Sequence, residues 1–197
     1  MPTLEAPFAS DRLSIVPWPD PVVEAVGHDP RSPYVELFWL PVLGPSTLWL
    51  LRRLAARFDD EPDGFILDLS CTAAELGLAE KTARTGPFVR SLVRSVQFGA
   101  SQPFGDGLAV RRKLPFVPER HVHRYPEPLK QAHRDWLARE EAVSAEQQRR
   151  RVYGLALTLL RLGEQPAEIT WQLHQWRFSP SLAAEAVAWA QARNDAA

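Results

Sequence analysis

The most regular pattern of hydrophobic and polar positions lies in the middle of the chain. Apolar and polar residues mostly alternate over residues 64–70, which predicts a short strand. Thr72 followed by Glu75 has the spacing of a capping box, in which each side chain bonds the other residue's backbone N–H. Gly77 suits the left-handed residue that ends a short helix. The pattern therefore predicts a strand, a short helix and a turn in succession.

A second helix is predicted over residues 87–97. Thr85 can cap its start, and Pro87 loses no hydrogen bond in the first turn. One face of this helix is apolar and contains Phe88, Val89, Leu92, Val93 and Val96. The opposite face contains Arg90, Ser91, Arg94 and Gln97. We expect this polar face to be exposed.

A β-hairpin is predicted to follow, with strands over residues 98–102 and 108–114. The turn between the strands contains Asp106-Gly107, a dipeptide that strongly favours hairpins. The second strand is basic and carries Arg111, Arg112 and Lys113.

This succession resembles the winged helix-turn-helix domain of bacterial transcription regulators. The resemblance covers residues 45–114, and residues 72–78 are similar to the first helix and turn of many such domains. It implies that helix 87–97 enters the major groove of double-stranded DNA, while the wing, residues 103–113, grips the backbone. It also implies a homodimer, because most such proteins bind DNA as dimers. The expected DNA-binding residues are Lys81, Thr82, Arg84, Thr85, Arg90, Ser91, Arg94, Gln97, Arg111, Arg112 and Lys113.

The distribution of charge supports this interpretation. Residues 81–113 contain seven Lys or Arg and one Asp, whereas the whole chain has a formal net charge of −1. Positive charge is therefore concentrated on the segment that the resemblance places against phosphate. Two alternatives stay open at this point: exposed arginines are often only solvated, and some winged helices bind proteins.

The predicted fold is mainly α with a small β-sheet, in four segments. Residues 1–32 form a proline-rich N-terminal arm, which is extended on the domain, flexible, or docked on a second copy. Residues 33–118 form the winged helix-turn-helix domain. Residues 119–143 form a connector helix, and residues 144–197 form a C-terminal three-helix unit that begins at a second capping box.

The first helix of the winged domain is predicted to start at Ser46 or Thr47, either of which can act as its cap. An aromatic cluster precedes it and contains Tyr34, Phe38 and Trp39. We interpret this cluster as core rather than interface, because large apolar residues are mostly buried.

Composition excludes several classes of protein. One Cys among 197 residues excludes an internal disulfide framework and fits a reducing cytoplasm. No apolar run approaches the ~20 residues of a membrane helix, and the N-terminus lacks the pattern of a signal peptide. The near-neutral net charge disfavours a histone-like coat protein. We expect a cytoplasmic, nucleoid-associated protein.

No motif for catalysis, a cofactor or a metal stands out. The chain has no phosphate loop, zinc-protease motif or nucleophile elbow. His121, His123 and His133 are interpreted as surface histidines rather than metal ligands, because no Cys or carboxylate accompanies them at ligand spacing. Together with Arg120 and Arg124, the first two of these histidines are candidates for phosphate contact.

We therefore expect a double-stranded DNA-binding protein, namely a transcriptional regulator and not an enzyme. One alternative is a protein-interaction module on the same scaffold, with a partner bound by the C-terminal bundle through Trp171, Trp176 and Trp189. Another is a nucleoid-type binder without sequence preference.

Overall fold

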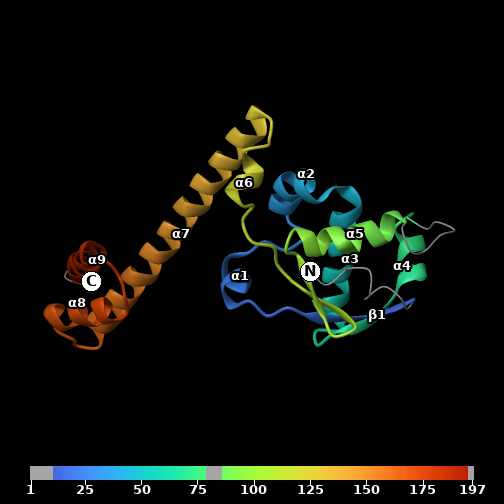
Figure 1. Cartoon of the computed structure of the whole chain (residues 1–197). Helices are drawn as coiled ribbons and strands as arrows, with labels where there is room; N and C mark the ends of the chain where they lie inside the picture. Colours follow the sequence, from blue (N-terminus) through green and yellow to red (C-terminus); the bar gives the residue numbers. More distant parts are fainter. Residues whose placement is uncertain (1–10, 79–85, 195–197) are drawn as a thin grey trace. The chain divides into compact units, whose positions relative to one another are not determined.

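The computed structural model describes residues 11–78 and 86–194 and divides the chain into two units, Met1–Lys130 and Gln131–Ala197. The described part is mainly helical with one small mixed sheet, which confirms the predicted fold class at this level (Figure 1). The predicted segment boundaries at residues 32, 118 and 143 do not coincide with this division.

The sheet of the N-terminal unit has four strands in the order β2-β1-β4-β3. Their bounds are β1 Arg12–Pro17, β2 Phe65–Asp68, β3 Ser101–Phe104 and β4 Gly107–Val110. Strand β1 pairs antiparallel with β2 and parallel with β4, while β3 and β4 pair antiparallel. The segment predicted as a separate arm therefore contributes an internal strand, followed by the short helix α1 (Pro21–Val26).

Burial explains why the arm forms this strand. Leu13 and Ile15 alternate with more exposed residues, and both are fully buried. The strand predicted over residues 64–70 is present as β2 but ends at Asp68, with Phe65 and Leu67 buried and Ile66 and Asp68 exposed. Phe65 packs on Phe58 of helix α3 (Pro45–Asp60), with ring centroids 5.1 Å apart. Apolar burial of this kind drives sheet and helix together.

The hairpin is present, but its geometry differs from the prediction. Its two-residue loop is Gly105-Asp106, because Phe104 pairs with Gly107. Gly105 has a φ of 58°, which suits the first central position of a hairpin turn. Gly107 lies in the strand, where a Cβ atom would stand 2.1 Å from the Ser14 carbonyl oxygen of β1. Strand β4 is buried throughout, since it has neighbours on both edges.

Helices α3 and α5 (Pro87–Gln97) pack against each other and cover one face of this sheet (Figure 1). Helix α3 begins at Pro45 after Gly44, without a side-chain cap, so the predicted cap at Ser46 or Thr47 is wrong. The predicted capping box at Thr72 is wrong as well. Helix α4 (Leu69–Glu75) is capped by Asp68, and the Thr72 hydroxyl donates to the Asp68 carbonyl inside it.

The aromatic cluster is core, as predicted, and it also fixes the segment after the hairpin. The cluster lies on the π-helical segment η2 (Val35–Trp39) and on Tyr34, the residue before it. Helix α2 (Leu40–Leu43) follows directly. Tyr34, Phe38 and Trp39 are buried. The Tyr34 hydroxyl accepts from the Val117 N–H at 2.9 Å, and Trp39 Nε1 donates to the Pro115 carbonyl at 2.8 Å. The chain between β4 and α6 (Glu119–Val122) is therefore held by polar atoms of aromatic side chains.

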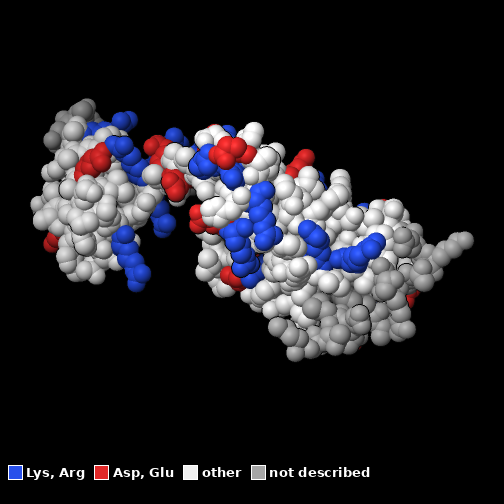
Figure 2. All heavy atoms as spheres, turned by 45° about the horizontal axis from the view of Figure 1, so that its top comes forward, with Lys and Arg blue, Asp and Glu red and all other residues white. Residues whose placement is uncertain are grey.

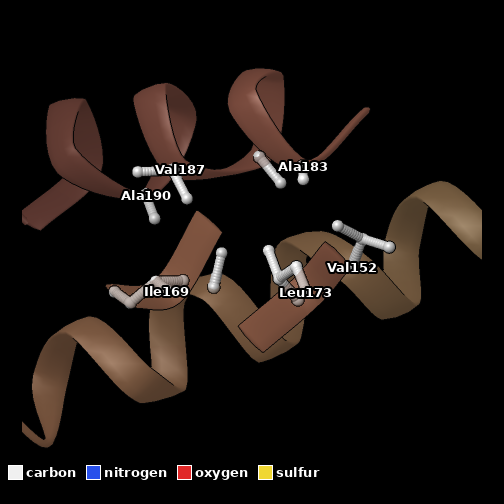
Figure 3. Close-up of a cluster of buried hydrophobic side chains, with 8 residues drawn as sticks. Val152, Ile169, Leu173, Ala183, Val187 and Ala190 are labelled. Carbon is white, nitrogen blue, oxygen red and sulfur yellow. The ribbon is translucent and has the colours of Figure 1, made fainter. Parts of the chain in front are cut away.

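The C-terminal unit is a small helical bundle with an alanine-rich core. Its helices are α7 (Glu127–Arg161), which begins before the boundary between the units, α8 (Pro166–Gln175) and α9 (Pro180–Asn194). The buried core, drawn in Figure 3, consists of Val152, Ala156, Ile169, Leu173, Ala183, Ala186, Val187 and Ala190. Helix α7 runs through Ser144, where the sequence predicted a helix start. No Gly or Pro follows Ser144 to interrupt the helix before Gly154.

Two further observations concern the described residues. Within residues 11–78 and 86–194, no helix combines the length and the apolar character of a membrane span. In the same ranges, no three His, Cys, Asp or Glu side chains group as metal ligands.

The internal position of β1 leads to a prediction about stability. Ile15→Ala removes a fully buried side chain and is expected to lower the free energy of unfolding by about 2–5 kcal/mol. Val22→Ala, at a side chain that is 71% exposed in α1, is expected to change it by less than about 0.5 kcal/mol. Urea denaturation followed by circular dichroism measures both. Equal midpoints for the two variants would show that the arm is dispensable.

Candidate nucleic-acid interface

Helix α5 carries the centre of the predicted site, and its buried face differs from the predicted stripe. Phe88 and Leu92 are buried as expected, but so are Ser91 and Ser95. Ser91 is 3% exposed, and its hydroxyl donates to the Pro87 carbonyl at 2.9 Å. A small side chain that satisfies its own hydroxyl can be buried where helices pack closely. Ser91 is therefore removed from the list of candidate DNA contacts.

The exposed face of α5 carries Arg90, Arg94 and Gln97, as predicted. The Arg94 guanidinium donates to the Val42 carbonyl at 2.6 Å and lies 4.9 Å from the centroid of Phe98. This bond and the ring contact hold the Arg94 side chain across the end of α2. Lys81, Thr82, Arg84 and Thr85, the other predicted contacts before this helix, lie outside the described residues.

The three bases of the predicted wing are used inside the protein. Strand β4 ends at Val110, so Arg111, Arg112 and Lys113 follow the hairpin rather than line it. The Arg111 side chain is 14% exposed and bonds the Asp20 carboxylate at 2.5 Å. Its guanidinium also donates to the Gly99 carbonyl at 3.1 Å and stacks 3.8 Å from the centroid of Trp18.

Arg112 and Lys113 are similarly engaged with the backbone. Arg112 donates to the Pro62 carbonyl and lies 5.5 Å from the ring centroid of Phe58. Lys113 Nζ donates to the Glu24 carbonyl at 2.6 Å. The three bases therefore fasten the chain after β4 to α1 and to the loop before β2. The three side chains are engaged within the protein, and their predicted contact with the DNA backbone stays a prediction.

A second group of cations lies on and after α6. Arg120 and Arg124 are exposed, and the ring of His121 between them packs at a tilt against Phe98, the C-cap of α5, with ring centroids 5.3 Å apart. Burial lowers the pKa of His121, and the positive charges of Arg120 and Arg124 lower it further. The positive potential around α6 therefore lies next to the C-terminal end of α5. The sequence named these arginines as candidates for phosphate contact, but its list of expected DNA contacts left them out.

We call Arg90, Arg94, Arg120 and Arg124 the basic surface. In the described part of the chain, none of the four forms an ion pair with a carboxylate. Other arginines of this unit do pair with carboxylates, namely Arg31, Arg52, Arg53, Arg57 and Arg111. Figure 2 shows Lys and Arg side chains gathered on the face of the N-terminal unit that carries α2, α5 and α6. The basic surface is thus the least neutralised cationic region of the described residues in this unit.

The histidines differ from the prediction in one respect. His123 is exposed and lies 3.7 Å from the Glu119 carboxylate, whereas His133 is 5% exposed and not a surface residue. Burial lowers the pKa of His133 and favours its neutral form.

Comparisons with known proteins assign this chain to no family. The chain matches no protein-family model, no curated protein and no solved structure.

The Arg111 anchor predicts an acid dependence of stability. Its hydrogen bond to Arg111, together with the Val23 N–H, holds the pKa of Asp20 below its usual value. The ionised carboxylate therefore stabilises the fold above the unfolded-state pKa, and this stabilisation is lost as pH falls through the folded-state pKa. Asp20→Asn keeps a good helix cap but removes the charge. We expect Asp20→Asn to be less stable than the wild type at neutral pH.

The same comparison repeated at lower pH provides the test. The difference in unfolding free energy between the wild type and Asp20→Asn should shrink as pH falls below about 4. Urea denaturation at a series of pH values measures it. A difference that stays constant from neutral to acid pH would contradict an ionic anchor at Asp20.

Proposed function

We propose that the N-terminal unit binds double-stranded DNA through the basic surface. The observation that carries the proposal is that four exposed arginines from α5 and α6 have no carboxylate partner among the described residues. DNA presents a dense line of phosphates, which such a surface would neutralise with release of counterions. A guanidinium group also binds phosphate oxygens in a bidentate manner.

The succession of elements supports a winged helix-turn-helix mode of binding. Helix α3, strand β2, helices α4 and α5, and the hairpin β3–β4 follow one another in the order of that domain. In this mode α5 is the helix presented to the major groove. Gln97 projects from its exposed face and is suited to base edges, while Arg90 and Arg94 are suited to phosphate.

In this proposal, residues on and after α6, and not the hairpin, contact the DNA backbone beside the major groove. Arg111, Arg112 and Lys113 are fastened internally, so a contact from any of them to DNA would break a bond within the protein. Arg120 and Arg124 have no such bond to a carboxylate. In this proposal they supply the phosphate contacts that the hairpin supplies in other winged helices.

A transcriptional regulator is the form of this function that we favour. The chain as a whole has a net charge of −1, which does not suit uniform coating of DNA. A homodimer, which would place two α5 helices on a palindromic site, remains part of the proposal.

A second candidate function concerns the C-terminal unit. Leu162, Trp171 and Trp176 are 75%, 64% and 50% exposed. Large apolar side chains on the surface of a small bundle favour a role in binding a protein partner. This role would be compatible with DNA binding by the other unit.

The DNA-binding proposal is tested with paired variants of equal charge. Arg120→Gln with Arg124→Gln is expected to weaken binding to random duplex DNA and to reduce the log–log salt slope by about 0.9 for each lost phosphate contact. Arg90→Gln with Arg94→Gln should have a similar effect. Fluorescence anisotropy with a labelled duplex, titrated with salt, measures the slopes.

The matched control is Arg31→Gln with Arg53→Gln. Both of these arginines are exposed, but they pair with Asp29, Asp59 and Glu75 instead of facing solvent alone. This control changes the net charge equally and should leave the salt slope unchanged. Equal losses in the control and the basic-surface variants would mean that only net charge matters. Absence of wild-type binding at low salt would reject the proposal.

His121 gives a pH dependence to the same interaction. Its pKa is lowered in the free protein by burial and by Arg120 and Arg124. A phosphate group beside these arginines would raise that pKa, so binding takes up a proton and becomes tighter as pH falls from 8 toward 6. Anisotropy titrations of the wild type and His121→Gln across this range measure the effect. The wild-type dependence should be larger; identical pH profiles would place phosphate away from α6.

A further inference from the structure

A groove lies between the start of α3 and the exposed side of α5. It has a volume of about 390 Å³, and its lining includes Ser46 and Thr47 from α3 and Arg90 and Arg94 from α5. No carboxylate lines it among the described residues. The charged side chains that line it, within the described ranges, are therefore both cationic.

The first turn of α3 adds hydrogen-bond donors. This helix has 16 residues, and its capping residue Gly44 provides no side-chain acceptor. The first N–H that bonds back within the helix is that of Leu48, which donates to the Gly44 carbonyl at 3.1 Å. The N–H groups of Ser46 and Thr47 precede it and belong to the unsatisfied first turn, where the helix dipole favours an anion.

Thr47 is the independent indication that something binds here. The residue is 2% exposed, and its hydroxyl, which keeps some contact with solvent, has no hydrogen-bond partner among the described residues. A hydroxyl of a largely buried residue that has no partner in the protein depends on water or a ligand for its hydrogen bond, and most buried polar groups in proteins are satisfied. Other buried hydroxyls of this unit follow that rule, since Thr72 and Ser91 both donate to backbone carbonyls. Thr47 lines the groove, so a ligand oxygen there would complete its bonding.

We propose that this groove is a binding site for a phosphate group. Arg94 donates to the Val42 carbonyl through one terminal nitrogen, which leaves other N–H groups of its guanidinium for a ligand. Arg90 lies one turn earlier on the same helix, and the two would flank an oxyanion bound at the N-terminus of α3. The phosphate belongs either to the DNA backbone, in which case the inference rests on the proposed function, or to a free phosphorylated solute.

The test is a calorimetric titration with inorganic phosphate and with pyrophosphate. Chloride keeps the ionic strength constant. The full-length wild type should bind saturably. Thr47→Val, which replaces the hydroxyl by a methyl group, should bind about tenfold more weakly, because one charge-assisted hydrogen bond is lost. Thr47→Ser keeps the hydroxyl and should bind like the wild type. Arg90→Gln with Arg94→Gln should abolish binding and serves as the second variant if Thr47→Val unfolds.

Arg120→Gln is the matched control, since it removes a charge of the basic surface that does not line the groove. It should weaken duplex binding but leave phosphate binding intact. Fluorescence anisotropy of a labelled DNA duplex, measured with the same proteins, distinguishes a phosphate of the DNA backbone from a free phosphorylated solute. A backbone phosphate predicts that Thr47→Val weakens duplex binding and that phosphate displaces the duplex more than chloride does. A free solute predicts that duplex binding is unchanged and that phosphate does not compete.

The outcomes distinguish this inference from the proposed function. Phosphate binding that depends on Thr47, without any duplex binding, would support the groove and reject DNA as its ligand. Duplex binding with the expected salt slope would leave the proposed function intact. The groove inference would still be overturned if phosphate did not bind and Thr47→Val bound the duplex like the wild type.

Discussion

The insertion of β1 between β2 and β4 is the constraint on which the N-terminal unit depends. Without this strand, β2 and the hairpin would share no hydrogen-bonded edge, because each is paired to β1. Two buried residues of β1, Leu13 and Ile15, connect the sheet to the helices that cover it. The chain ahead of α3 is thus part of the core of this unit, and not an appendage.

This insertion also determines which cations stay available. Because β4 runs beside β1, the chain that leaves β4 passes next to the residues that follow β1. Asp20 and Trp18 then take up Arg111, and α1 takes up Lys113 through a backbone carbonyl. Arg111, Arg112 and Lys113 therefore stabilise the fold through bonds within the protein. The exposed charges of the basic surface lie instead on α5 and on and after α6. Hydrogen bonds from the aromatic side chains of Tyr34 and Trp39 hold the segment between β4 and α6.

The sequence predicted local features well and long-range pairing poorly. Strand β2, helix α5 and the burial of the aromatic cluster follow from periodicity and residue type, which are local properties. The partner of Arg111, however, lies 91 residues away in sequence, and no spacing rule connects them. Ser91 was misassigned because a serine on a helix is equally consistent with solvent and with a close helix contact. The unpaired hydroxyl of Thr47 is likewise a property of tertiary structure alone.

The pairing of arginines bears on why the basic surface exists. An exposed ion pair contributes little to stability, typically about 0–1 kcal/mol, so folding alone does not require that Arg90 or Arg120 be neutralised. Leaving these cations unpaired therefore costs the fold little. The pKa of His121, which burial lowers, is lowered further by the local positive potential of Arg120 and Arg124. Such a potential has its main effect on anions that approach from solvent, since it raises their rate of encounter and their local concentration. The same argument applies with more force in the groove beside α3, where two arginines and a helix N-terminus both favour an anion.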